Sequence, residues 1–122
     1  MRKMTAMAVA GAVCVVSVGT CEAQRDLDGE WLLEMCHEYV IEEQENGTSA
    51  MEGLCLGFIH GVIEVGEATN DKHWKVCPLD TAKVGNIAKV LVKILEDTPE
   101  IHHERASVIV VKLLQKAHPC PS

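Results

Sequence analysis

The chain has few aromatic side chains and no excess of positive charge. Its 122 residues include only four aromatics, Trp31, Tyr39, Phe58 and Trp74, too few for a base-stacking platform or for a sugar-binding groove. There are 11 basic against 18 acidic residues, a formal net charge of −7. A chain without surplus Lys and Arg cannot neutralise many phosphates, so we expect no nucleic-acid partner.

Signatures of catalysis are also missing. The sequence contains no H-E-x-x-H, no G-x-S-x-G and no glycine-rich phosphate loop. His102 and His103 are adjacent, so a helix would point them about 100° apart rather than at one ligand. Glu42, Glu43 and Glu45 stand in a polar stretch, without the apolar pocket that separates a catalytic acid from a base. We therefore expect a protein that is not an enzyme and that holds no metal or cofactor.

One apolar run, residues 4–18, follows Arg2 and Lys3. It is shorter than the roughly 20 residues that a membrane-spanning helix needs, and small or polar residues follow at 19–23. This order is typical of a secretory signal peptide. We predict cleavage after Ala23, which leaves residues 24–122 as one secreted domain outside the membrane. The alternatives are an uncut membrane anchor and a lipoprotein acylated at Cys21, although Thr20 before that cysteine fits the lipoprotein pattern poorly.

Loss of residues 1–23 removes Arg2, Lys3 and Glu22 and changes the charge balance. The remaining chain has 9 basic and 17 acidic residues, a net charge of −8. Four cysteines remain, and about 99 residues bury only a modest core, so disulfides would stabilise it.

Apolar residues recur at helical spacing in four segments, with no alternating strand pattern. The sequence therefore predicts an all-α fold, a small disulfide-stapled bundle of four main helices. The expected N-terminal caps are Asp28 for the first helix, Ser49 with Glu52 for the second, Asp80 or Thr81 for the third, and Thr98 with Pro99 for the fourth.

The second predicted helix is apolar on most sides and carries Gly53, Gly57 and Gly61 at a spacing of four residues. Each glycine costs about 1 kcal/mol of helix propensity relative to alanine. In a membrane this pattern would favour a helix dimer. In this chain we expect the flat strip to serve close packing inside the bundle.

The four remaining cysteines allow three pairings. Cys36 lies about five residues before its helix ends and Cys55 about five after the next begins, so both reach the same height in an antiparallel pair. Cys77 and Cys120 flank the third and fourth helices at similar distances. We therefore predict the disulfides Cys36–Cys55 and Cys77–Cys120. Structural zinc is the alternative, but the chain has no C-x-x-C pair.

Several motifs in order resemble a known family. They are the segment from Gly29 to Cys36, the C-L-G-F-I-H-G run at 55–61, Cys77-Pro78, the segment from Val92 to Glu100, and the terminal A-H-P-C-P. Together they resemble the Rap/Tai family of periplasmic immunity proteins against type VI secretion amidase effectors, over residues 28–121. The resemblance implies a periplasmic helical protein, often a homodimer, that binds a peptidoglycan-cleaving amidase and blocks its Cys-His active site.

Such an inhibitor needs an exposed segment that enters the enzyme cleft, and two connections qualify. One is the acidic stretch 42–48 and the other is the loop 70–75, in which Trp74 is a candidate anchor because Trp is favoured at binding hot spots. A net charge of −8 would steer the protein toward a basic partner. The candidate partner-binding residues are Glu42, Glu43, Glu45, Asn46, His73 and Trp74.

A second function class fits the same composition. A periplasmic acid-stress chaperone, or another non-catalytic envelope protein, is also small, helical and disulfide-bonded. Such a chaperone would expose apolar surface when its carboxylates lose charge on acidification. Suppression of client aggregation at low pH would favour it, whereas a stable complex with one amidase would favour immunity.

Overall fold

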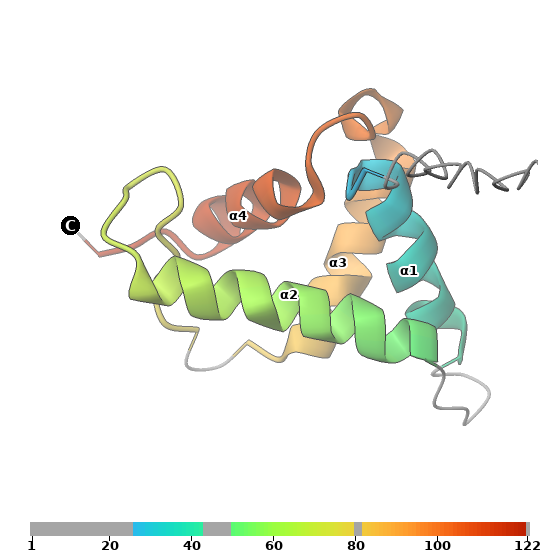
Figure 1. Ribbon diagram of the computed structural model, residues 1–122, viewed down its shortest axis with the longest axis horizontal. Helices are drawn as coiled ribbons and strands as arrows, with labels where there is room; N and C mark the ends of the chain where they lie inside the picture. The colour runs from blue at the N-terminus through green and yellow to red at the C-terminus, as the bar shows by residue number, and fades with distance from the viewer. Residues whose placement is uncertain (1–25, 43–49, 80–81, 122) are drawn as a thin grey trace, which may run out of the picture.

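The computed structural model describes residues 26–42, 50–79 and 82–121. They form four α-helices, α1 (Gly29–Glu42), α2 (Ala50–Ala68), α3 (Val84–Asp97) and α4 (Ala106–Ala117), with a short 3₁₀ helix, η1 (Pro99–Ile101), before α4 (Figure 1). The described part of the chain contains no strand, which confirms the all-α bundle of four main helices. None of its helices is long and apolar enough to cross a membrane. The predicted signal peptide lies outside the described residues.

The core forms where α2 meets the other three α-helices, and α1 also packs against α3 (Figure 1). Its centre is aliphatic, with the sulfur atoms of one cysteine pair among the aliphatic side chains. The largest fully buried side chains are Leu32, Ile59, Leu91, Leu95, Leu114, Val76, Val110, Cys36 and Cys55. The aromatic pair Trp31 and Phe58 bridges α1 and α2 edge to face, with ring centroids 5.2 Å apart.

The start of α1 is held by its predicted cap and by the segment that precedes α4. The Asp28 Oδ1 atom accepts a hydrogen bond from the Trp31 backbone N–H at 2.9 Å, which confirms the cap. The Ala106 N–H donates to the Leu27 carbonyl at 2.8 Å, and the Gly29 N–H donates to the Glu104 carbonyl. A Cβ atom at position 29 would lie 2.8 Å from the backbone of residue 102. Only glycine, which has no Cβ atom, therefore lets the two backbones come this close.

One predicted helix start is wrong, and a second holds only for a short turn. The N-cap of α3 is Lys83, so neither Asp80 nor Thr81, which lie outside the described residues, caps the helix. Thr98 and Pro99 do begin a helical turn, because Thr98 is the N-cap of η1, but the helix expected from there is interrupted after η1 and resumes only at Ala106. The reason is tertiary: the backbone of residues 102–106 pairs with residues 27–30 instead of continuing the helix. Ser49, the predicted cap of α2, lies outside the described residues.

The glycine strip of α2 does not pack inside the bundle, which overturns that expectation. Gly53, Gly57 and Gly61 are exposed, and a Cβ atom built on any of them would meet nothing within 4 Å. The opposite side of α2, with Cys55, Ile59 and Ile63, fills the core instead. The glycine of α2 that packs closely is Gly66, where a Cβ atom would lie 2.6 Å from the Val76 Cγ2 atom.

Both disulfides join the predicted partners. Cys36 and Cys55 link α1 to α2 with 5.0 Å between their Cα atoms, and both side chains are fully buried. Cys77 and Cys120 link the α2–α3 connection to the segment after α4, with Cα atoms 5.3 Å apart. Cys120 is exposed and Cys77 is half-buried.

Candidate partner-binding surface

The connection that leaves α2 forms a compact turn, residues 69–76, which we call the tip. The Trp74 N–H donates to the Asp71 carbonyl at 3.0 Å, which closes a β-turn. The Asp71 Oδ1 atom accepts from the His73 N–H at 2.9 Å, and the Thr69 hydroxyl accepts from the Asp71 N–H. Aspartate favours the first position of such a turn because its short side chain satisfies the backbone locally. The turn is therefore specified by its own sequence.

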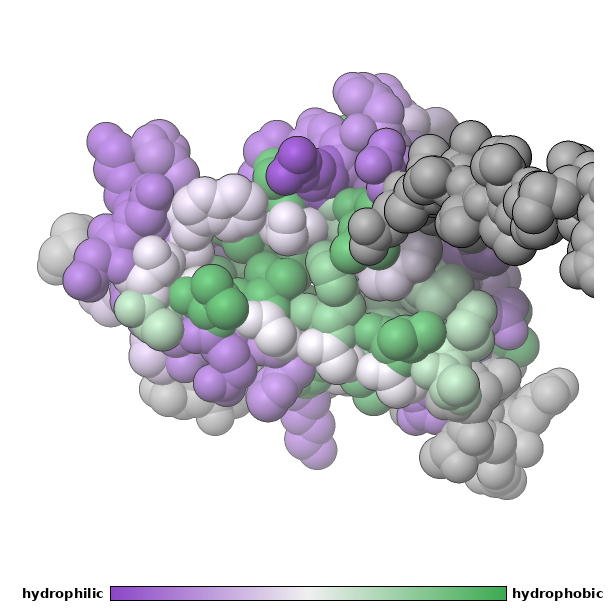
Figure 2. All heavy atoms as spheres, viewed as in Figure 1, coloured by the Kyte–Doolittle hydropathy of each residue, from purple (hydrophilic) through white to green (hydrophobic). Residues whose placement is uncertain are grey.

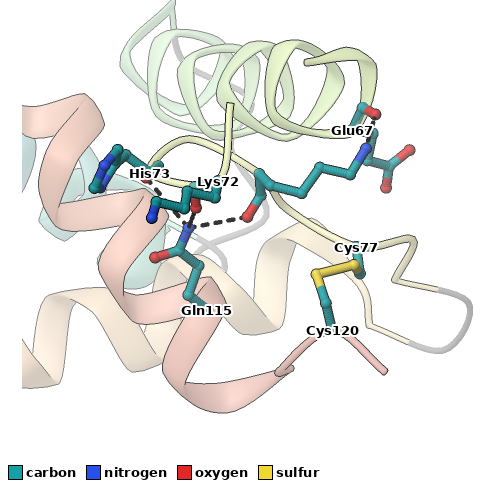
Figure 3. Close-up of a disulfide and its surroundings, with 7 residues drawn as sticks. Glu67, Lys72, His73, Cys77, Gln115 and Cys120 are labelled. Carbon is teal, nitrogen blue, oxygen red and sulfur yellow. Dashed lines mark hydrogen bonds between the residues drawn. A yellow bond between two sulfur atoms is a disulfide. The ribbon is translucent and has the colours of Figure 1, made fainter. Parts of the chain in front are cut away.

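One side chain of α4 fastens the tip to the bundle. The Gln115 Nε2 group donates to the carbonyl oxygens of Lys72, His73 and Lys75, at 3.4, 3.2 and 3.0 Å (Figure 3). Since an amide carries two hydrogens, these three acceptors share them. All three carbonyls thus face α4, and the tip is tied to the bundle through its backbone.

Further bonds fix the two ends of the tip. The Lys75 Nζ atom donates to the Glu67 carbonyl at 2.6 Å, a carbonyl near the C-terminus of α2 that lacks a helical partner (Figure 3). The Val76 N–H donates to the Gly66 carbonyl at 3.0 Å. The Cys77–Cys120 disulfide follows at once along the chain. The tip therefore holds its shape without a partner.

The side chains of the tip face solvent beside two hollows. Lys72 and His73 are exposed, and Trp74 is 41% exposed. A hollow of about 340 Å³ between the tip and α4 is lined by Trp74, Val108 and Val111 among others. A second hollow, of about 360 Å³ between α2 and α4, shares Trp74 and Val111. Its other lining residues include Phe58, Val62, Val65, Gly57, Gly61 and Gly66.

The second hollow lies beside a wider apolar surface on α2. Leu54 is 52% exposed and Val65 is 68% exposed. Figure 2 shows hydrophobic residues gathered over α2 on the side of the molecule that faces the viewer. Exposed apolar surface of this extent on a small protein marks a place for contact with another molecule.

The candidate residues named from the sequence fall in two places. His73 and Trp74 lie together on the tip and are exposed. Glu42 is the last residue of α1, whereas Glu43, Glu45 and Asn46 lie outside the described residues. Sequence reasoning missed Gln115, which stands in an ordinary helical pattern, and it gave no sign that Leu54 and Val65 of α2 are exposed.

Charge is unevenly divided over the surface. The helices α1 and α2 contain seven glutamates and no Lys or Arg, whereas α4 contains Lys112 and Lys116 and no acidic residue. Lys112 Nζ binds the Glu104 carboxylate at 2.7 Å. No cluster of three His, Cys, Asp or Glu side chains among the described residues is arranged to hold a metal ion. The tip and its hollows can therefore bind another molecule through surface contact and hydrogen bonds.

The sequence matches the family of Rap1a immunity proteins over residues 28–120. The chain belongs to the Rap1a immunity protein family. The matched region begins at the Asp28 cap and ends at Cys120, so it includes all four α-helices and both disulfides. No curated protein and no solved structure was found to be similar.

Membership of the Rap1a family gives the general role of the protein. An immunity protein acts by binding a secreted toxin, and this task requires no catalysis. The partner is therefore a cognate toxin protein, and the exposed tip with its two hollows is a candidate surface for that contact.

Proposed function

We propose that this Rap1a-family protein neutralises a peptidoglycan amidase delivered by a type VI secretion system, and that its tip contacts the enzyme. The observation that carries the proposal is Trp74, 41% exposed on a turn whose backbone carbonyls are bound by Gln115. A large aromatic side chain on a fixed loop binds at little cost in ordering entropy. A loop of this kind suits insertion into an enzyme cleft, where it would exclude substrate.

The proposed place of action is the periplasm. The N-terminal segment has the order of a signal peptide, and both disulfides suit an oxidising compartment. We therefore propose residues 24–122 as the active form. The peptidoglycan that such a toxin attacks lies in the same compartment, so the immunity protein would meet the toxin where damage occurs.

The decisive experiment combines residues 24–122 with a small secreted amidase encoded by a neighbouring gene. We expect a stable complex in gel filtration and loss of peptidoglycan hydrolysis on addition of the immunity protein. Trp74→Ala should weaken the complex about 30-fold, the effect of a hot-spot residue worth about 2 kcal/mol. Val90→Ala, which shortens an exposed apolar side chain on α3, is the matched control and should change affinity less than about twofold.

The outcomes separate the two parts of the proposal. Unchanged inhibition by Trp74→Ala would remove the tip from the interface while leaving the amidase as the target. Absence of any complex or inhibition would remove the amidase function itself. A chaperone would instead suppress the aggregation of unrelated proteins at low pH, and light scattering measures that directly.

We also propose that two copies pair through the glycine strip of α2. Gly53, Gly57 and Gly61 leave room for the close approach of another helix, and the exposed Leu54 and Val65 supply apolar contact area. Light scattering should then give twice the mass of one chain. Gly57→Glu should yield the single-chain mass and Val90→Glu should not. A single-chain mass for the unaltered protein would refute the pairing.

A further inference from the structure

Two hollows beside the tip are lined by basic side chains, although the chain as a whole is acidic. The hollow between the tip and α4 is lined by Lys72, His73 and Lys112, and a neighbouring hollow of about 410 Å³ is lined by Lys72 and Lys75. Among the described residues, no carboxylate lines either hollow. This basic region belongs to a chain that carries a net charge of −8 over residues 24–122.

The bonds within the tip leave one cation to face a partner. The carboxylate of Asp71 accepts from the His73 N–H and so lies against the turn, where it keeps its negative charge. The Lys75 ammonium binds the Glu67 carbonyl, and the Lys112 ammonium binds Glu104. The Lys72 side chain is exposed and has no ion pair within the described ranges. The tip therefore presents Lys72 and the His73 imidazole beside Trp74.

Local charge decides which surface the tip accepts. Charges beyond about 8 Å are largely screened at physiological salt, so the charges next to a contact matter more than the net charge of the chain. Two charges that meet in a contact attract or repel each other more strongly when water is excluded from between them. An ammonium group that docks against a basic surface is repelled, and the same group docked against carboxylates is attracted. The contact therefore selects an acidic surface.

We propose that the toxin site that receives the tip carries carboxylates around an apolar recess, which accepts Trp74. This inference rests on the proposed function and reverses the expectation, drawn from net charge alone, of a basic partner. Lys72 would pair with a toxin carboxylate at the rim of the recess. Because Gln115 binds the Lys72 carbonyl, the backbone from which this ammonium projects is fixed before binding.

The chemistry of the tip is tested without the toxin by a peptide probe. The acetylated, amidated pentapeptide Glu-Phe-Glu-Leu-Glu is titrated into ¹⁵N-labelled residues 24–122, and Lys-Phe-Lys-Leu-Lys serves as the charge-reversed probe. We expect the acidic peptide to shift the Trp74 indole signal and the amide signals of Lys72 and His73. The basic peptide should leave these signals in place.

Two lysine variants complete the test. Lys72→Glu should abolish the shifts and should weaken the toxin complex at least about tenfold. Lys83→Glu makes the same charge change at an exposed lysine before α3, and it should leave both measurements within about twofold. Unchanged amide spectra of both variants away from the substitution would show that the fold is intact.

Each outcome has one meaning. Shifts that cluster away from the tip, a preference for the basic peptide, or no shift at all would overturn the inference. If the toxin complex forms and Lys72→Glu does not change its affinity, the acidic site is refuted and the immunity function stands. If the acidic peptide binds the tip but no amidase forms a complex, the tip chemistry stands and the proposed function falls.

Discussion

The two disulfides join different kinds of structure. Cys36–Cys55 links two helices in the centre of the core, and neither side chain is exposed. Cys77–Cys120 links two irregular segments, at a half-buried and an exposed cysteine. The first therefore takes part in the packing that holds α1 against α2. The second fixes where the chain leaves the tip, next to the Gln115 bonds (Figure 3).

Removal of the buried disulfide should have the largest effect on stability. For Cys36→Ala with Cys55→Ala, opening a loop with a sequence separation of 19 costs about 3 kcal/mol of the free energy of unfolding. The missing sulfur atoms leave a cavity that costs about 2 kcal/mol more. Urea unfolding should show a loss close to the whole stability of a small domain. A smaller loss than that of the exposed pair would contradict the distinction.

Removal of the exposed disulfide should loosen the tip while the core remains folded. For Cys77→Ala with Cys120→Ala, the chain-entropy model gives an upper value of about 4 kcal/mol for a separation of 43. No core cavity forms because Cys120 is exposed. Hydrogen exchange should accelerate at residues 72–76 and stay slow in α1 and α2. Equal acceleration throughout the chain would show that this disulfide also supports the core.

Gln115→Ala should weaken the tip without touching either disulfide. Loss of the amide leaves three backbone carbonyls without their shared donor, a local cost of about 1–2 kcal/mol. We expect faster exchange of the His73 and Trp74 amides and stronger quenching of Trp74 fluorescence by iodide. The neighbouring exposed residue supplies the control, Lys116→Ala. Equal exchange in both variants would mean that the disulfide alone orders the tip.

Two glycines of α2 should respond with opposite signs. Gly57→Ala adds a methyl group to open space and should stabilise the helix by about 1 kcal/mol. Gly66→Ala places a Cβ atom 2.6 Å from Val76 beneath the tip, and overpacking should destabilise by about 1–3 kcal/mol. Thermal unfolding at a dilution that keeps single chains measures both. A rise in midpoint for Gly66→Ala would show that the backbone relaxes easily there.

Local sequence patterns predicted the features that depend on near neighbours in the chain. Helical periodicity located α1 to α4, and Asp28 caps α1 as expected because a cap needs only the next three residues. The similar distances of the cysteines from the helix ends predicted the pairs Cys36–Cys55 and Cys77–Cys120, and both disulfides are present. The same periodicity misassigned the faces of α2. A helix that is apolar on most sides buries only the face that its neighbours cover.

The candidate site was only partly predictable. Trp74 and His73 stand in a polar connection, so their exposure followed from the sequence. Gln115 lies 40 residues or more from the carbonyls that it binds, and no local pattern marks such a contact. The basic character of the tip was hidden by the net charge, because a sum over the chain does not place charges in space.

The sequence alone determined the helical class, the cysteine pairs and the exposed turn, since each depends on residue spacing or local bonding. Tertiary structure alone decided that Gly53, Gly57 and Gly61 face outward, that the chain after η1 pairs with the start of α1, and that Gln115 holds the tip. The physical reason is that each depends on which segments, distant in the sequence, the packed core brings together or leaves uncovered.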